Sequence, residues 1–129
     1  MTGNHAPARI LVADDDPVIL RLLEVNLGLE GFDVLTAASG EQALASAKQD
    51  LPALILLDVM MPGMNGWDVV ERLREEAATA DIPVVLLSAR TQEQDRRRAD
   101  ELRVAGYVTK PFDPAELAAI IRRLALRSS

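Results

Sequence analysis

Three consecutive carboxylates close an apolar run near the start of the chain, where Asp14, Asp15 and Asp16 follow the segment RILVA. A fourth acid, Asp58, ends the apolar run ALILL. Two like charges about 4 Å apart repel by about 1 kcal/mol in water and by about 4 kcal/mol at an effective dielectric constant near 20. Acids gathered in a folded protein therefore need solvent, local hydrogen bonds or a bound cation to offset their repulsion.

The elements that must position these acids are short strands alternating with helices. Strands are predicted at residues 9–14, 33–37, 53–57, 83–87 and 106–109. Helices are predicted from residue 17 to near residue 31, and over 40–48, 66–76, 91–102 and 114–126. Three of the five strands are continuously apolar, which is typical of strands covered on both faces. The alternation predicts an α/β fold with a parallel sheet and helices on both of its faces.

The first helix is expected to begin at Pro17, with Asp16 as its N-cap. Helical spacing predicts an inward apolar stripe made of Ile19, Leu22, Leu23 and Leu27. Four more apolar residues lie outside this stripe: Val18, Leu20, Val25 and Leu29. Some of them must therefore face solvent.

The carboxyl ends of parallel strands share one edge of the sheet, and such folds bind their ligands at that edge. The side chains expected there are Asp14, Asp15, Asp58, Ser88 and Lys110. Three carboxylates without a histidine favour a hard cation, Mg²⁺ or Mn²⁺. An ammonium group and a hydroxyl beside such an ion suit phosphoryl transfer, in which a carboxylate can be the nucleophile.

Four stretches resemble motifs of the receiver domain of bacterial response regulators: RILVADDDP, LILLDVMMPGMNGWDV, VVLLSA and GYVTKPFDPAEL. The resemblance extends from Arg9 to about Leu126. It implies a flavodoxin-like fold of five βα units with the strand order 2-1-3-4-5. It also divides the chain into a flexible tail over residues 1–8, a receiver domain over 9–126 and a short tail over 127–129.

The resemblance assigns a role to each residue at the sheet edge. Asp58 resembles the phosphoryl acceptor. Asp14 and Asp15 resemble the acids that hold Mg²⁺, Asp15 directly and Asp14 mostly through water. The backbone carbonyl of Met60 is implied as a further metal ligand, and Ser88 resembles the switch hydroxyl that turns toward the phosphoryl group.

Four further positions complete the resemblance. Lys110 resembles the invariant lysine, and its peptide bond to Pro111 is usually cis in the family. Tyr107 resembles the aromatic switch, although it could instead pack on the last helix. Met60 and Arg90 occupy the positions that tune self-dephosphorylation, and an apolar Met60 is expected to obstruct the attacking water.

A receiver domain implies partners on two surfaces. A histidine kinase or histidine phosphotransferase is expected to dock on the first helix and the loop after the fifth strand, although scattered surface apolar residues are also normal. An output protein or effector domain would use the fourth helix, fifth strand and fifth helix. Many DNA-binding members carry an acid just before the tyrosine, paired with an arginine of a second copy. Gly106 replaces that acid here, which weakens the expectation of such a dimer through Arg122 or Arg123.

Bulk composition excludes several other classes. A net charge of -6 argues against a nucleic-acid surface, and the run from Arg96 to Arg98 is interpreted as a solvated helix face. The absence of cysteine excludes disulfides, and the single histidine, His5, argues against zinc. Neither a membrane span nor a signal peptide is visible, so we expect a cytoplasmic protein. We expect a switch that phosphorylates itself from small donors and dephosphorylates itself, and not a turnover enzyme.

An alternative function is a phosphatase of the haloacid dehalogenase type. In that case Asp14 would be the nucleophile and Asp16 the acid–base, with Ser88 and Lys110 in later motifs. This alternative leaves Asp58 without a role, and the chain has no room for a cap insertion. Flavin binding is disfavoured because the acids after the first strand would repel an anionic phosphate.

Overall fold

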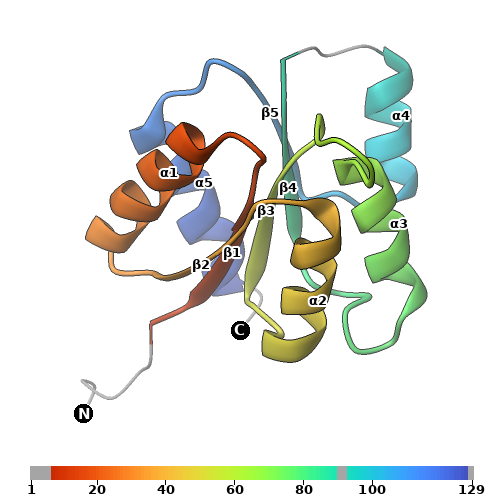
Figure 1. The fold of residues 1–129 in the computed structure, drawn as a ribbon, viewed down its shortest axis with the longest axis horizontal. Helices are drawn as coiled ribbons and strands as arrows, with labels where there is room; N and C mark the ends of the chain where they lie inside the picture. The colour runs from red at the N-terminus through yellow and green to blue at the C-terminus, as the bar shows by residue number, and fades with distance from the viewer. Residues whose placement is uncertain (1–6, 90–92, 128–129) are drawn as a thin grey trace.

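The structure of the protein, a computed structural model, describes residues 7–89 and 93–127. Its centre is a parallel sheet in the order β2-β1-β3-β4-β5, which confirms the expected topology (Figure 1). The strands are β1 (Arg9–Ala13), β2 (Asp33–Ala37), β3 (Leu54–Asp58), β4 (Val84–Ser88) and β5 (Gly106–Thr109). The helices are α1 (Pro17–Leu29), α2 (Gly40–Asp50), α3 (Gly66–Glu75), α4 (Glu93–Glu101) and α5 (Pro114–Arg127). None of these helices is long and apolar enough to cross a bilayer.

Two differences in strand bounds bear on the site. β3 and β4 each begin and end one residue later than predicted, so Asp58 and Ser88 are the last residues of their strands. β1 ends one residue earlier than predicted, so Asp14 and Asp15 lie just beyond it. The ends of the strands therefore fix the positions of these four side chains. The predicted residues 91–92 of the fourth helix lie outside the described part of the chain.

Each face of the sheet carries its own apolar core, because successive side chains of a strand point to opposite faces. One core joins Ile10, Val12, Leu54 and Leu56 to α1 and α5. The other joins Leu11, Ile55, Leu57 and Leu86 to α2, α3 and Ala99 of α4. Figure 1 shows α1 and α5 on one side of the sheet and α2 and α3 on the other, with α4 next to α3. Both faces are covered, as the continuously apolar strands predicted.

The prediction for the inward face of α1 is wrong at Leu22, which is exposed. Leu23 and Leu27 are buried as predicted, and Ile19 is half-buried against the same core. Leu20 is half-buried there as well, because it precedes Leu23 by three residues and so shares its face. The exposed apolar residues form a separate stripe at helical spacing, made of Val18, Leu22, Val25 and Leu29.

Local hydrogen bonds fix where the helices start after the strands. Asp16 is the N-cap of α1, as predicted, and its Oδ1 accepts the Val18 N–H at 2.9 Å. A capping box starts α3, with Asn65 Oδ1 accepting from the Asp68 N–H and Asp68 Oδ2 accepting from the Asn65 N–H. Each cap stabilises a helix by about 1 kcal/mol. α1 and α3 therefore begin close to the acids that follow β1 and end β3.

Candidate functional site

Three carboxylates converge at the carboxyl edge of the sheet. Asp14, Asp15 and Asp58 each offer an oxygen, and these oxygens lie within 4.8 Å of one another. The convergence follows from topology, because β1 and β3 are parallel neighbours whose ends lie side by side. Asp14 is 1% exposed and Asp58 is 4% exposed, whereas Asp15 is open to solvent.

Lys110 reaches into this cluster from beyond β5. Its Nζ lies 3.3 Å from Asp14 Oδ2 and 3.3 Å from Asp58 Oδ2. The backbone N–H of Lys110 donates to the Ser88 carbonyl at 2.8 Å, and the peptide bond from Lys110 to Pro111 is cis. One ammonium group thus bridges two buried carboxylates that come from different strands.

The electrostatics of the cluster show an unbalanced negative charge. Burial raises the pKa of Asp58, and the charge of Asp14 raises it further, while Lys110 and the Met60 N–H act in the opposite direction. Burial lowers the pKa of Lys110, but the two carboxylates outweigh that effect and its pKa is raised overall. A single ammonium faces three acids, so the site favours a further cation.

The donor set fits a hard divalent ion. All three candidate ligands are carboxylate oxygens, the type that Mg²⁺ and Mn²⁺ prefer. Asp14 Oδ1 already accepts the Asp16 N–H at 2.9 Å, and Asp14 Oδ2 accepts from Lys110. The exposed carboxylate of Asp15 is the more accessible ligand of the two.

The remaining predicted residues surround the cluster, with one outside the described part. Ser88 is buried at the end of β4, the strand next to β3. Met60 is 64% exposed, and its N–H donates to Asp58 Oδ1 at 3.2 Å. Arg90 lies outside the described residues.

Tyr107 packs against Trp67 of α3. Its ring centroid lies 6.2 Å from that of Trp67, and it belongs to the core on the α3 side of the sheet. The ring therefore packs on the α3 side of the sheet, whereas the core that includes α5 lies on the other side. Whether Tyr107 acts as a switch stays a prediction.

Two residues near the site, Trp67 and Arg98, differ from what the sequence predicted. A groove of about 510 Å³ beside Ser88 is lined by Met60, Trp67 and Arg98. Arg96 and Arg97 are exposed as predicted, but Arg98 is half-buried over the Trp67 ring. Trp67 is the only tryptophan of the chain and the second residue of α3, which begins after the loop that follows Asp58. A single tryptophan so close to the acceptor was the sequence signal that could have placed it near the site.

Comparison with known proteins agrees with this geometry. The sequence profile of the family described as the response regulator receiver domain matches residues 10–122. The chain belongs to this family. The match gives no support to the phosphatase alternative, and Asp16, which that alternative needs as acid–base, caps α1.

Relatives of this receiver domain are longer regulators. The DNA-binding dual master transcriptional regulator RpaA of Synechocystis sp. is 44% identical over 120 residues, which are 93% of this chain and 50% of that protein. The response regulator PleD of Caulobacter vibrioides is 47% identical over 117 residues, which are 91% of this chain and 26% of that protein. The chain spans about half the length of most of the curated relatives that it matches.

Solved structures show the same receiver fold. The chemotaxis protein CheY4 of Vibrio cholerae superposes with a TM-score of 0.87 at 30% identity, over 92% of this chain and 99% of the other. Near-complete coverage of both chains shows that this receiver domain has the full set of elements of that fold.

Proposed function

We propose that this receiver domain is a phosphorylation-controlled switch, which accepts a phosphoryl group on Asp58 from a histidine kinase or histidine phosphotransferase. One observation carries the proposal. The buried carboxylate of Asp58 lies 3.3 Å from the ammonium of Lys110, inside a cluster with two further acids. A buried, paired carboxylate at the ligand-binding edge of a parallel sheet is placed to act as a nucleophile.

The chemistry is an in-line transfer. An Asp58 carboxylate oxygen attacks phosphorus, and the P–N bond to the donor imidazole breaks as the new O–P bond forms. The imidazole leaves as a neutral base after taking up a proton. The Met60 N–H holds Asp58 Oδ1 during the attack. Lys110, already next to Asp58 Oδ2, is placed to pair with an oxygen of the transferred group.

Asp14, Asp15 and Asp58 would hold Mg²⁺, or Mn²⁺, together with the backbone carbonyl of Met60. Such an ion supplies positive charge that offsets the charge developing on the phosphoryl oxygens. Because both Asp14 oxygens already accept hydrogen bonds, Asp15 is proposed as the direct ligand and Asp14 as a ligand through water.

Two residues would convert the new phosphoryl group into a change of shape. Ser88 would turn its hydroxyl toward the phosphoryl oxygens. Tyr107 would follow by moving inward from its half-buried position, and the face formed by α4, β5 and α5 would repack for an output protein or effector domain. Met60, exposed beside the acceptor, would lengthen the lifetime of the aspartyl phosphate by obstructing water, and Arg90 would also tune the rate of self-dephosphorylation.

The exposed apolar stripe of α1 is proposed as the docking surface for the phosphodonor. Val18 is 72% exposed and Leu29 is 82% exposed, and α1 begins shortly after Asp14 and Asp15, the proposed metal ligands. A partner on this stripe would therefore lie next to Asp58. Arg122 is engaged within the chain, since it donates to Glu30 and stacks on Phe32. That engagement weighs further against a dimer contact through Arg122.

The test is incubation with acetyl phosphate and Mg²⁺, followed by intact mass measurement of the wild type and the Asp58→Asn variant. We expect one added phosphoryl group on the wild type and none on the variant. Equal labelling of both proteins would contradict the proposal. Turnover of p-nitrophenyl phosphate that survives Asp58→Asn and is lost in Asp14→Asn would instead favour the phosphatase.

A further inference from the structure

One arginine of α4 makes two contacts with α3. The Cζ of Arg98 lies 5.0 Å from the centroid of the Trp67 ring, within cation–π range. Its Nη2 donates to Glu71 Oε1 at 2.7 Å, which makes a short ion pair. A planar guanidinium suits both contacts at once, because it can stack on a ring while donating in its plane.

The rest of α4 contributes little to its own attachment. Its sequence is EQDRRRADE, and Ala99 is its one buried residue. A single alanine offers much less apolar area than the buried residues of the other helices, each of which includes at least one leucine. Apart from Ala99, and from Leu102 and Val104 directly after the helix, Arg98 is therefore a main contact that keeps α4 against α3.

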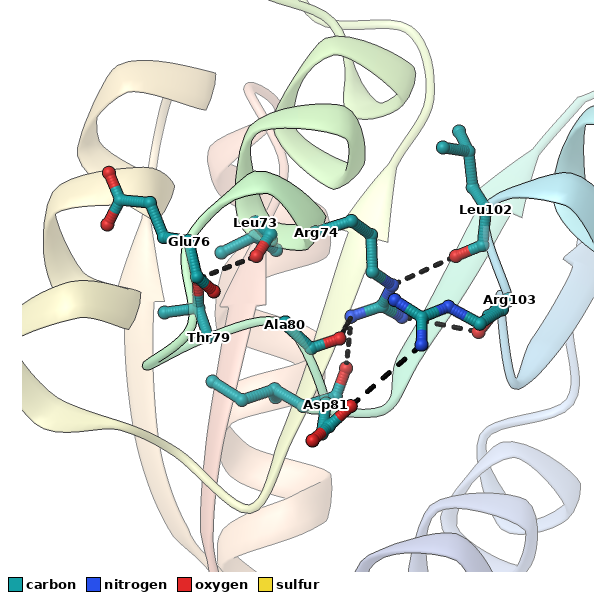
Figure 2. Close-up of polar contacts among 9 residues, drawn as sticks. Leu73, Arg74, Glu76, Thr79, Ala80, Asp81, Leu102 and Arg103 are labelled. Carbon is teal, nitrogen blue, oxygen red and sulfur yellow. Dashed lines mark hydrogen bonds and ion pairs between the residues drawn. The ribbon is translucent and has the colours of Figure 1, made fainter.

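The carboxyl end of α4 is fixed by a different arginine (Figure 2). The Arg74 guanidinium donates to the Leu102 carbonyl at 2.9 Å and to the Arg103 carbonyl at 3.2 Å. It also donates to the carbonyls of Ala80, at 3.1 Å, and Ile82, at 2.8 Å, in the connection between α3 and β4. One side chain thus connects the segment after α4 to the segment that leads into β4.

The amino end of α4 is linked to the phosphoryl site. Only four residues separate Ser88 from Glu93, the first residue of α4. Ser88, Trp67 and Arg98 also line the same groove beside the acceptor, and the Tyr107 ring adjoins Trp67. A displacement at Ser88 would therefore reach α4 at the end opposite to the one that Arg74 contacts.

We propose that Arg98 is a latch, a positioning residue that favours the unphosphorylated arrangement by holding α4 against Trp67 and Glu71. Switching tilts α4 about its Arg74-bound end, and Arg98 must leave the Trp67 ring for that tilt to occur. This inference rests on the proposed function, because it concerns how the same phosphoryl site is regulated.

The size of the effect follows from the two contacts. An exposed or half-buried cation–π contact or ion pair shifts a two-state equilibrium by about two- to fivefold. Removing both at Arg98 should raise the population of the released arrangement by about fivefold or more while that population is small. In this proposal the released arrangement is the one that accepts the phosphoryl group, so the phosphorylation rate should rise by the same factor.

The experiment compares wild type with Arg98→Leu, Glu71→Gln and Arg97→Leu. Arg97→Leu is the matched control, because Arg97 is the exposed neighbour on the same helix and has no ion pair among the described residues. Two rates are measured on each protein: phosphorylation by acetyl phosphate with Mg²⁺, and amide hydrogen exchange of α4 without a phosphodonor.

We expect Arg98→Leu to be phosphorylated about fivefold faster and to exchange its α4 amides faster, while Arg97→Leu matches the wild type. Glu71→Gln should be intermediate, because it keeps the ring contact. If the α4 amides of Arg98→Leu exchange faster but its phosphorylation is no faster, the contact is merely structural and the latch is overturned. Unchanged α4 exchange in Arg98→Leu would also overturn the latch. A wild type that takes up no phosphoryl group would overturn the proposed function and the latch together, whereas failure of Arg98→Leu alone overturns only the latch.

Discussion

Replacing Gly66 with alanine should displace the backbone of the acceptor, Asp58. A Cβ at Gly66 would lie 2.7 Å from the Asp58 carbonyl oxygen and 2.9 Å from the Val59 Cα. Both are backbone atoms, so the clash can be relieved only by moving the end of β3 or the start of α3. Overpacking of this kind costs about 1–3 kcal/mol, and the better helix propensity of alanine recovers at most about 1 kcal/mol of it. We expect a net loss of about 1–2 kcal/mol in the free energy of unfolding.

Gly28→Ala is the matched control for this prediction. Gly28 lies within α1, and a Cβ there meets no described atom within 4 Å. The same chemical change should therefore stabilise the protein by about 0.5–1 kcal/mol. Urea unfolding followed by circular dichroism measures both variants.

A second assay links this perturbation to the site. Trp67 directly follows Gly66, so its fluorescence can report a titration with Mg²⁺. We expect weaker Mg²⁺ binding in Gly66→Ala and unchanged binding in Gly28→Ala. If Gly66→Ala is as stable as Gly28→Ala and binds Mg²⁺ like the wild type, the close packing of Gly66 against Asp58 does not constrain the acceptor.

Three further predictions concern stability. Arg103 follows α4 with a φ of 57°, a conformation that costs a side chain about 1 kcal/mol, so Arg103→Gly should raise the free energy of unfolding by about that amount in urea titrations. Arg74→Met removes the donor to four carbonyls and should cost about 3 kcal/mol, with Arg74→Lys recovering less than half, because one ammonium cannot reach them all. Burial and Asp14 raise the pKa of Asp58, so its ionisation opposes folding, and Asp58→Asn should stabilise the metal-free protein at pH 7. This gain should vanish as the pH falls below about 3.9, where the wild-type carboxyl is protonated in both states, and thermal unfolding across pH measures it.

Strand ends were the most predictable part of the site. Short, mainly apolar runs located the strands within one residue, and the shared edge of a parallel sheet then brought Asp14, Asp58 and Lys110 together. The rule works because it depends on topology alone and needs no knowledge of side-chain packing.

Side-chain packing between distant segments was less predictable. Leu22 was placed inward because helical periodicity gives a wide apolar stripe without fixing its edges, and the neighbouring α5 and β2 decide which residues it buries. The partners of Arg74 are backbone carbonyls, which leave no residue-type signal in the sequence. Arg98 was interpreted as solvated because its ring partner, Trp67, lies 31 positions away on another helix.

Chemical mapping of the phosphorylated residue tests the central claim most directly. Borohydride reduces an aspartyl phosphate to homoserine, so treatment after incubation with acetyl phosphate and Mg²⁺ marks the acceptor for peptide mass spectrometry. We predict homoserine at position 58 and aspartate retained at positions 14, 15 and 16. Homoserine at position 14, or at none of the four, would contradict the assignment of Asp58 as the acceptor.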